Sequence, residues 1–186
     1  MIKAIETEYN GYLFRSRVEA RWAVFFDTLG IRYEYEEDVY NIDGTWYLPD
    51  FHLPEQKCWF EVKGDEQGIK NNHDLYQGFA GKIGPLVAFT TPSIDTVGTK
   101  FIICAHDSNA GYSTNDVSWY FCPTSGFQLS LRCSYRCTVW TGNWEDPVKV
   151  CSSCDVNSNS TCHDFVHPWI IDAYRAARQA RFEHHL

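Results

Sequence analysis

The spacing of apolar residues predicts one helix near each end of the chain. Within residues 15–30, apolar side chains recur at intervals of three and four, as on the buried face of a helix: Val18, Trp22, Phe25, Phe26 and Leu29. Ser16 is a favourable N-cap residue, and Gly30 is a natural stop after the last apolar position. Residues 168–184 carry a similar stripe after Pro168, which suits the first position of a helix.

Strand patterns fill much of the chain between these helices. Residues 31–38 alternate and are rich in strand-forming side chains, and turn-forming residues follow at 41–44. The polar stretch 64–72 is expected to be a loop. The remaining expected elements are strands at 45–53, 57–63, 85–90 and 100–104 and a short helix at 73–83.

A change in composition at residues 107–115 predicts a boundary, because Asp, Ser, Asn and Gly replace the apolar pattern there. Beyond it, short aromatic strands alternate with cysteines. We therefore expect an α/β core over residues 1–106, a cysteine-rich β insert over 116–165, and a closing helix in 166–186 that packs on the core.

Net charge and hydropathy indicate which binding partners, nucleic acid or membrane, are compatible with the chain. The 186 residues include 16 Lys and Arg against 24 Asp and Glu, a net charge of −8, which disfavours nonspecific binding to nucleic acid through bulk charge. A nucleic-acid partner then requires a local basic face or a bound divalent cation. No apolar run approaches the roughly 20 residues of a membrane span. The first residues lack the apolar stretch of a signal peptide, so we expect a cytoplasmic protein without a membrane partner.

Two acids and a lysine form the most informative pattern. Asp50 is followed after ten residues by Glu61, and Lys63 comes two positions later. Because side chains alternate along a strand, Glu61 and Lys63 are expected on one face, with Phe60 and Val62 on the other. If the neighbouring strand supplies Asp50, two carboxylates and an ammonium share a patch that suits Mg²⁺ or Mn²⁺.

This set of groups is suited to phosphodiester hydrolysis. Asp50, Glu61 and the main-chain carbonyl of Val62 would hold the ion, which polarises a phosphoryl oxygen and lowers the pKa of a bound water. Lys63 would orient that water and stabilise the charge that develops on the phosphate. Because an acidic pocket in an acidic protein repels nucleic acid, we predict that activity depends on the metal.

The pattern Pro49-Asp50…Glu61-Val62-Lys63 resembles the PD-(D/E)XK motif of the restriction-endonuclease-like nucleases. The expected order of a helix, a three-stranded antiparallel meander, a helix and a further strand is similar to their core. Residues 14–22 resemble the first helix of phage-encoded and transposon-end members, in which a helical glutamate joins the metal cluster, and residues 178–184 resemble tails of phage nucleases. The resemblance implies a Mg²⁺-dependent endonuclease, active in a bacterial host cell if phage-encoded, with acidic ligands at Glu19, Asp50 and Glu61 and a catalytic lysine at Lys63.

Structural roles compete with these assignments. Ser16 and Glu19 also fit a capping box, in which the glutamate bonds back to the helix N-terminus. The spacing of Glu19 with Trp22 and Phe26 instead points it towards the sheet. Asp50 also fits a strand-end turn, with Glu61 and Lys63 as a solvated pair. His52 is close enough in sequence to reach the same face, although we favour a structural role for it.

The cysteines of the insert predict a structural zinc site. Cys133 and Cys137, a gap of thirteen residues, and then Cys151 and Cys154 give four thiolates at suitable spacing. The second pair resembles a zinc knuckle. Other residues that would replace one of the four are Cys122, Cys162 and His163. The alternatives to zinc are buried, reduced cysteines without metal and, less favoured, a redox-active pair at Cys151 and Cys154.

Two groups of arginines are candidates for phosphate contacts, with a solvated helix face as the alternative for each. They are Arg15, Arg17 and Arg21 beside the first helix and Arg175, Arg178 and Arg181 on the last. The sequence thus predicts a metal-dependent nuclease that acts on DNA rather than RNA. The alternative is a noncatalytic module of the same fold that binds nucleic acid or protein, such as a phage factor acting on a host system.

Overall fold

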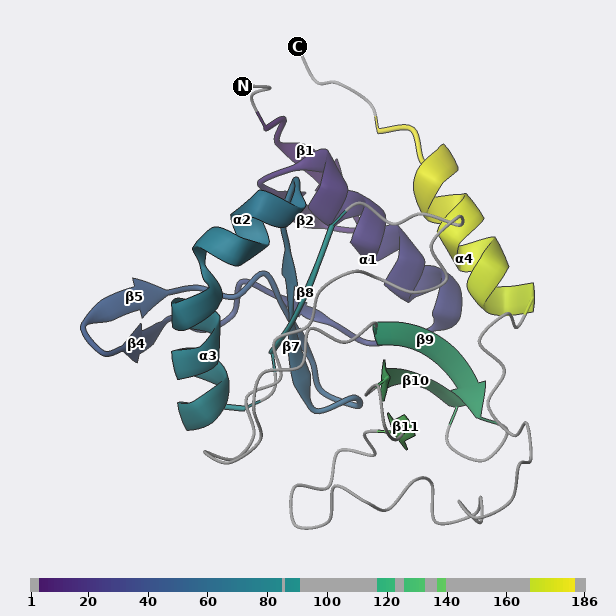
Figure 1. Cartoon of the computed structure of the whole chain (residues 1–186). Helices are drawn as coiled ribbons and strands as arrows, with labels where there is room; N and C mark the ends of the chain where they lie inside the picture. The colour runs from purple at the N-terminus through teal and green to yellow at the C-terminus, as the bar shows by residue number, and fades with distance from the viewer. Residues whose placement is uncertain are drawn as a thin grey trace.

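The protein has a mixed α/β fold, described by a computed structural model (Figure 1). The structure describes residues 4–84, 86–90 and 168–182, together with the backbone of β9 (Val117–Cys122), β10 (Gly126–Arg132) and β11 (Cys137–Val139). These last three strands form an antiparallel sheet in the order β11-β10-β9. The predicted zinc site lies outside the described residues, except for the backbone of Cys122 and Cys137. The expected strand at 100–104 and the boundary at 107–115 also lie outside them.

A four-stranded sheet forms the centre of the fold, in the order β3-β6-β7-β8. Its strands are β3 (Glu34–Tyr35), β6 (Phe51–Leu53), β7 (Cys58–Val62) and β8 (Leu86–Phe89). The first three pair antiparallel, and β8 runs parallel to β7, with Glu61 opposite Ala88.

Two hairpins flank this sheet. One of them includes part of the segment 45–53, for which a single strand is expected from the sequence. The hairpins are β1 (Thr7–Tyr9) with β2 (Tyr12–Phe14), and β4 (Tyr40–Ile42) with β5 (Thr45–Tyr47). Residues 45–53 are divided between β5 and β6 instead of forming one strand. Pro49, which has no N–H to donate, lies in the break between them. The expected turn at 41–44 connects β4 to β5.

Helix α1 (Arg17–Leu29) confirms the first periodic segment. Ser16 caps it by accepting the N–H of Glu19, and Gly30 ends it in the left-handed region with φ of 67°. Its apolar face packs on the sheet, where the ring of Trp22 lies 4.8 Å from Phe60. Helix α4 (Pro168–Gln179) packs beside α1 through Tyr174, and it ends before the expected limit of 184 (Figure 1).

The opposite face of the sheet is covered by α2 (Glu66–Asn71), α3 (His73–Lys82) and the β4–β5 hairpin (Figure 1). The prediction of a loop at 64–72 is wrong, because most of this segment forms α2. The Asp65 side chain caps this helix by accepting the N–H of Gly68 at 2.7 Å, and Ile69 is buried in the second core. Ile69 is the apolar side chain that anchors this six-residue helix on the sheet. None of the helices in the described part of the chain is long and apolar enough to span a membrane.

Candidate functional site

Asp50 lies just before β6, and its side chain is buried against β7. One carboxylate oxygen, Oδ2, accepts the main-chain N–H of Val62 at 2.6 Å. The other, Oδ1, accepts a hydrogen bond from Nη2 of Arg15, also at 2.6 Å. Only 1% of the residue is exposed. Oδ2 is thus held by the backbone of β7, and Oδ1 by a side chain that is half exposed.

Glu61 lies on β7 and points to the face of the sheet opposite Phe60 and Val62, as the alternation predicts. Its Oε2 accepts the hydroxyl of Tyr47 at 2.6 Å and the main-chain N–H of Asp50 at 3.3 Å. The residue is 1% exposed. Oε2 is therefore fixed by Tyr47 on β5 and by the main chain just before β6.

Lys63 follows β7 and forms an ion pair with Oε1 of Glu61. The hydroxyl of Tyr76, on α3, donates to the same oxygen at 3.3 Å. About 28% of the lysine side chain is exposed, so the ammonium lies at the rim of the site. The structure thus brings together Asp50, Glu61 and Lys63, as the strand geometry predicts.

Glu19 is buried nearby but is held in a different network. Its Oε1 accepts the Ser16 hydroxyl at 2.7 Å, and its Oε2 accepts the Tyr35 hydroxyl at 2.6 Å and the Arg15 main-chain N–H at 3.1 Å. These bonds correspond to the capping role. In the described residues, Glu19, Asp50 and Glu61 do not each place an oxygen within 4.8 Å of the others. Direct ligation by Glu19 therefore stays a prediction.

The charges of the site perturb one another. Burial, followed by the negative charge of Glu61, raises the pKa of Asp50 well above its usual value. For Lys63, burial lowers the pKa, but the carboxylates of Glu61 and Asp50 together raise it by more than burial lowers it. The pKa of Lys63 is therefore above its usual value. Lys63 is therefore an ammonium at neutral pH. Burial, and then the charge of Glu61, also raise the pKa of Tyr47 and of Tyr76, so both remain hydrogen-bond donors.

This donor set fits a small divalent cation. Mg²⁺ prefers one or two carboxylates together with waters and substrate phosphates. Asp50 and Glu61 are two buried carboxylates, and burial, followed by the charge of Glu61, raises the pKa of Asp50; a cation between the two acids would offset both effects. In the structure, the positive charges next to the two carboxylates are those of Arg15, paired with Asp50, and Lys63, paired with Glu61.

Three tyrosines of the site were not singled out by sequence reasoning: Tyr35, Tyr47 and Tyr76. Tyr47 stands three residues before Asp50, and this proximity is the one local signal for it. Tyr76 is brought in by α3, and Tyr35 reaches Glu19 from β3. No sequence pattern indicates either contact.

A second group of metal-type side chains lies at the edge of the sheet. Glu34, Glu37 and His52 place one potential ligand atom each within 4.8 Å of one another. His52 Nδ1 lies 2.8 Å from Glu34 Oε2, and its ring stacks on Trp59 at 4.8 Å. These contacts correspond to the structural role expected for His52, which is not bonded to Asp50.

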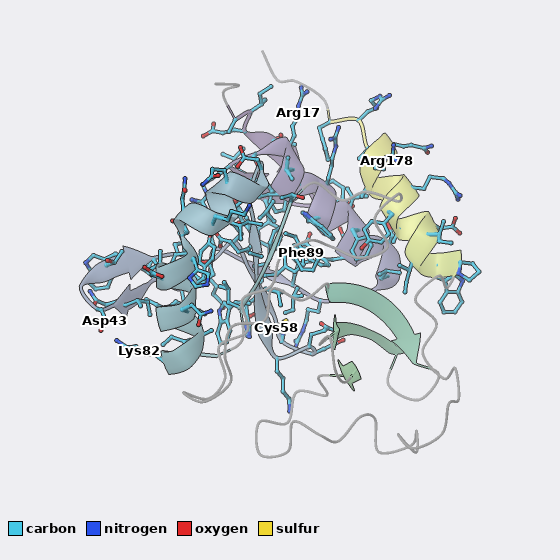
Figure 2. The ribbon with its side chains drawn as sticks, viewed as in Figure 1. Arg17, Asp43, Cys58, Lys82, Phe89 and Arg178 are labelled. Carbon is cyan, nitrogen blue, oxygen red and sulfur yellow. The ribbon has the colours of Figure 1, made fainter. Side chains whose placement is uncertain are left out.

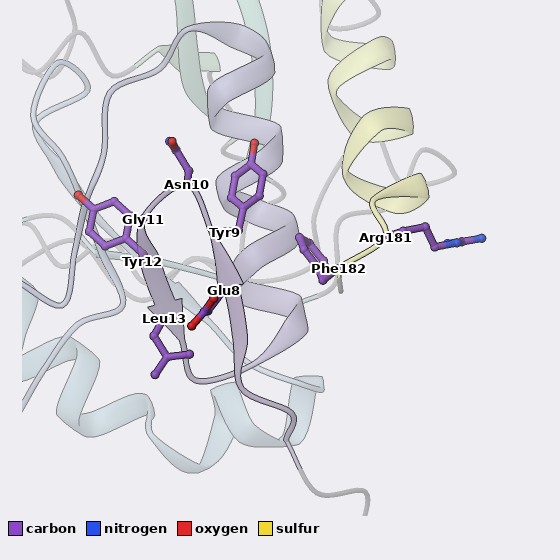
Figure 3. A pocket seen from close by; sticks show the side chains of 8 residues that line it. All are labelled: Glu8, Tyr9, Asn10, Gly11, Tyr12, Leu13, Arg181 and Phe182. Carbon is purple, nitrogen blue, oxygen red and sulfur yellow. The ribbon is translucent and has the colours of Figure 1, made fainter. Parts of the chain in front are cut away.

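The candidate phosphate-binding arginines are spread over the α1 and α4 region. Arg17 and Arg178 lie towards the same end of this helix pair (Figure 2). Arg175 forms an ion pair with Asp172. Arg181 borders a groove of about 560 Å³ between the β1–β2 hairpin and Phe182, and its side chain points away from the hairpin (Figure 3). Of these arginines, Arg15 forms an ion pair with the site carboxylate of Asp50.

No protein-family model, curated protein or solved structure matches this chain. The case for a function therefore depends on the residues and geometry described above.

Proposed function

We propose that this protein is a Mg²⁺- or Mn²⁺-dependent nuclease that hydrolyses phosphodiester bonds in DNA. The observation that supports the proposal most directly is the convergence of Asp50, Glu61 and Lys63 at the ends of two paired strands. Two buried carboxylates with an ammonium at the rim are costly for stability, because buried charges must be paired. Such a cluster is more readily explained by chemistry than by folding.

The order of elements supports a restriction-endonuclease-like core. Helix α1 is followed by the antiparallel strands β3, β6 and β7, then by α2 and α3, and then by β8 parallel to β7. The two acids lie where β6 begins and where β7 ends, next to the N-terminus of α1. This order is similar to the one expected from the resemblance, with the β4–β5 hairpin added between β3 and β6 and with two helices in place of one.

Each residue has a role in the proposed hydrolysis. Asp50 Oδ1 and the Glu61 carboxylate, with the Val62 carbonyl, would hold the ion, which polarises the phosphate and acidifies a water. Lys63 remains protonated, so it orients that water and stabilises the developing charge instead of acting as a base. Tyr47 and Tyr76 fix the direction of the Glu61 carboxylate through their hydroxyl donors.

A cleavage assay tests the proposal. The purified protein is incubated with Mg²⁺ or Mn²⁺ and single-stranded, duplex or branched DNA, or RNA, beside Asp50→Asn, Lys63→Ala and the control Asp43→Asn. Asp43 is an exposed hairpin residue, paired with Lys82. We expect the two site variants to lose activity by about 100-fold or more, the control to retain it, and EDTA to stop cleavage. Equal activity in folded Asp50→Asn, or no cleavage of any substrate with either ion, contradicts the proposal.

One observation favours the alternative of a noncatalytic binding module. Arg15 and Lys63 already pair with the two acids, so the cluster is neutralised by the chain itself. A binding module would bind DNA, RNA or a protein equally well with EDTA present, and Asp50→Asn would not affect that binding. The same variants, measured by fluorescence anisotropy with labelled DNA and with labelled RNA, distinguish the two functions.

We also propose structural zinc in the cysteine-rich region, with Cys133, Cys137, Cys151 and Cys154 as ligands. A site of four thiolates is closed to substrate, so its role is in folding. Elemental analysis of the purified protein should give about one zinc per chain, and Cys151→Ser should lower that content. Wild-type protein without zinc contradicts this assignment.

A further inference from the structure

Arg15 joins the first hairpin to α1 and reaches across to the acids of the site. Its Nη2 donates to Asp50 Oδ1 at 2.6 Å, and its Nε forms an ion pair with Glu36. The Arg15 side chain is 53% exposed, whereas that of Asp50 is 2% exposed. A half-exposed cationic side chain is thus paired with a buried carboxylate.

The main chain of Arg15 is held independently of this contact. Its N–H donates to Glu19 Oε2 at 3.1 Å and to the Tyr35 hydroxyl at 3.0 Å. Ser16, the next residue, is the N-cap of α1. The backbone is therefore anchored at the start of α1 by contacts that do not involve the guanidinium.

Arg15 occupies one oxygen of the proposed ion ligand. Asp50 Oδ2 accepts the N–H of Val62, and Oδ1 accepts the guanidinium. A guanidinium has only donors and cannot itself ligate a metal. A divalent ion at Oδ1 and the guanidinium beside it would repel each other strongly in a buried site. That repulsion would be relieved if the ion displaced the guanidinium from Oδ1.

We propose that Arg15 holds the ion position at Asp50 until a divalent cation replaces it, and that the released guanidinium then binds the substrate phosphate beside that cation. This inference rests on the proposed nuclease function. The planar guanidinium matches a phosphate through two parallel hydrogen bonds. Glu36, at the rim, keeps the released side chain near the site.

The first measurement is metal binding without DNA. Mn²⁺ binding is followed by loss of the free-ion electron paramagnetic resonance signal, for wild type, Arg15→Gln, Asp50→Asn and the control Arg178→Gln. Arg178 is an exposed arginine on α4, and its variant changes the net charge equally. We expect Arg15→Gln to bind Mn²⁺ about five- to tenfold more tightly, because the competing charge is absent. Arg178→Gln should bind like wild type in this measurement without DNA.

The second measurement is cleavage of duplex DNA at saturating Mn²⁺. Arg15→Gln should raise the KM for DNA about tenfold, because one phosphate contact is lost. Arg15→Lys, which keeps the charge but not the planar fork, should lie between wild type and Arg15→Gln. Tighter Mn²⁺ binding together with a higher KM for DNA would identify the proposed role of Arg15, since a merely structural defect would weaken the binding of both.

The outcomes separate the inference from the nuclease assignment. If wild type binds Mn²⁺ and cleaves DNA, but Arg15→Gln binds the ion no more tightly or keeps the wild-type KM, the role of Arg15 is wrong and the nuclease assignment stands. If wild type shows no Mn²⁺ binding that Asp50→Asn removes, both are overturned. Circular dichroism of each variant establishes that it is folded.

Discussion

Asp50 and Glu61 are connected through the backbone of the two strands that carry them. The main-chain N–H of Asp50 donates to Glu61 Oε2 at 3.3 Å, while Asp50 Oδ2 accepts the N–H of Val62, the residue after Glu61, at 2.6 Å. The pairing of β6 with β7 sets this geometry, with Phe51 opposite Phe60. The two acids are therefore held close together whether or not a cation is bound, and this preorganisation has measurable consequences.

The pH dependence of stability should report the burial of Asp50 beside Glu61. The pKa of Asp50 is raised in the folded state, first by burial and then by Glu61. Its contribution to stability is therefore complete below the unfolded pKa of about 4, and it is lost as the pH rises through the raised native value.

In EDTA, the free energy of unfolding of wild type, minus that of Asp50→Asn, should decrease between pH 4 and pH 8. Mg²⁺ should restore it at the alkaline end, because an ion that binds only the folded state stabilises it. Urea denaturation at several pH values measures this. A difference that increases with pH in EDTA contradicts the interpretation.

The tyrosines around Glu61 should differ in importance. Tyr47 donates to Oε2 at 2.6 Å, whereas Tyr76 donates to Oε1 at 3.3 Å, where Lys63 also binds. Tyr47→Phe leaves a buried carboxylate oxygen with one donor fewer, so it should cost about 1–3 kcal/mol of stability. Tyr76→Phe should cost less, because Lys63 still neutralises Oε1. Urea denaturation measures the loss of stability in each variant. An equal loss, or a larger loss for Tyr76→Phe, would show that the lengths of these two hydrogen bonds do not reflect their strengths.

Trp22 should be among the most sensitive positions of the core. It is fully buried between α1, the sheet and α4, with ring contacts to Phe60, Phe89 and Tyr174. Trp22→Ala should cost about 3–5 kcal/mol through the cavity that it leaves. The matched control is Trp46→Ala on the β4–β5 hairpin, where 72% of the residue is exposed and a change within about 0.5 kcal/mol is expected. Similar losses for both tryptophans would contradict the packing described here.

Two glycines of α3 offer a matched pair. A Cβ at Gly81 meets nothing within 4 Å, so Gly81→Ala should stabilise the helix by about 0.5–1 kcal/mol. A Cβ at Gly78 would lie 2.8 Å from Cγ2 of Ile42, which is buried in the hairpin beneath. Gly78→Ala should therefore be destabilising despite the same gain in helix propensity. Thermal unfolding of both variants tests this, and stabilisation by Gly78→Ala would indicate a looser contact between α3 and the β4–β5 hairpin.

Local patterns predicted the elements that present the acids. The periodicity and caps of α1 depend on residues a few positions apart, as does the alternation that separates Glu61 from Phe60. Where local cues conflict with burial, the prediction fails. Residues 64–72 are mostly polar, but Ile69 and the Asp65 cap are sufficient for α2 because the sheet offers a surface to cover.

The sequence by itself determined that Glu61 and Lys63 emerge from one face of a strand and that a capped helix begins at Ser16, because both follow from periodicities of two and 3.6 residues. Only the tertiary structure decided that Arg15 closes the Asp50 carboxylate and that Tyr76 reaches Glu61. These partners are 35 and 15 residues apart, on different elements. Sheet register and the packing of helices on both faces bring such groups together. These contacts therefore cannot be predicted from the spacing of the residues along the chain.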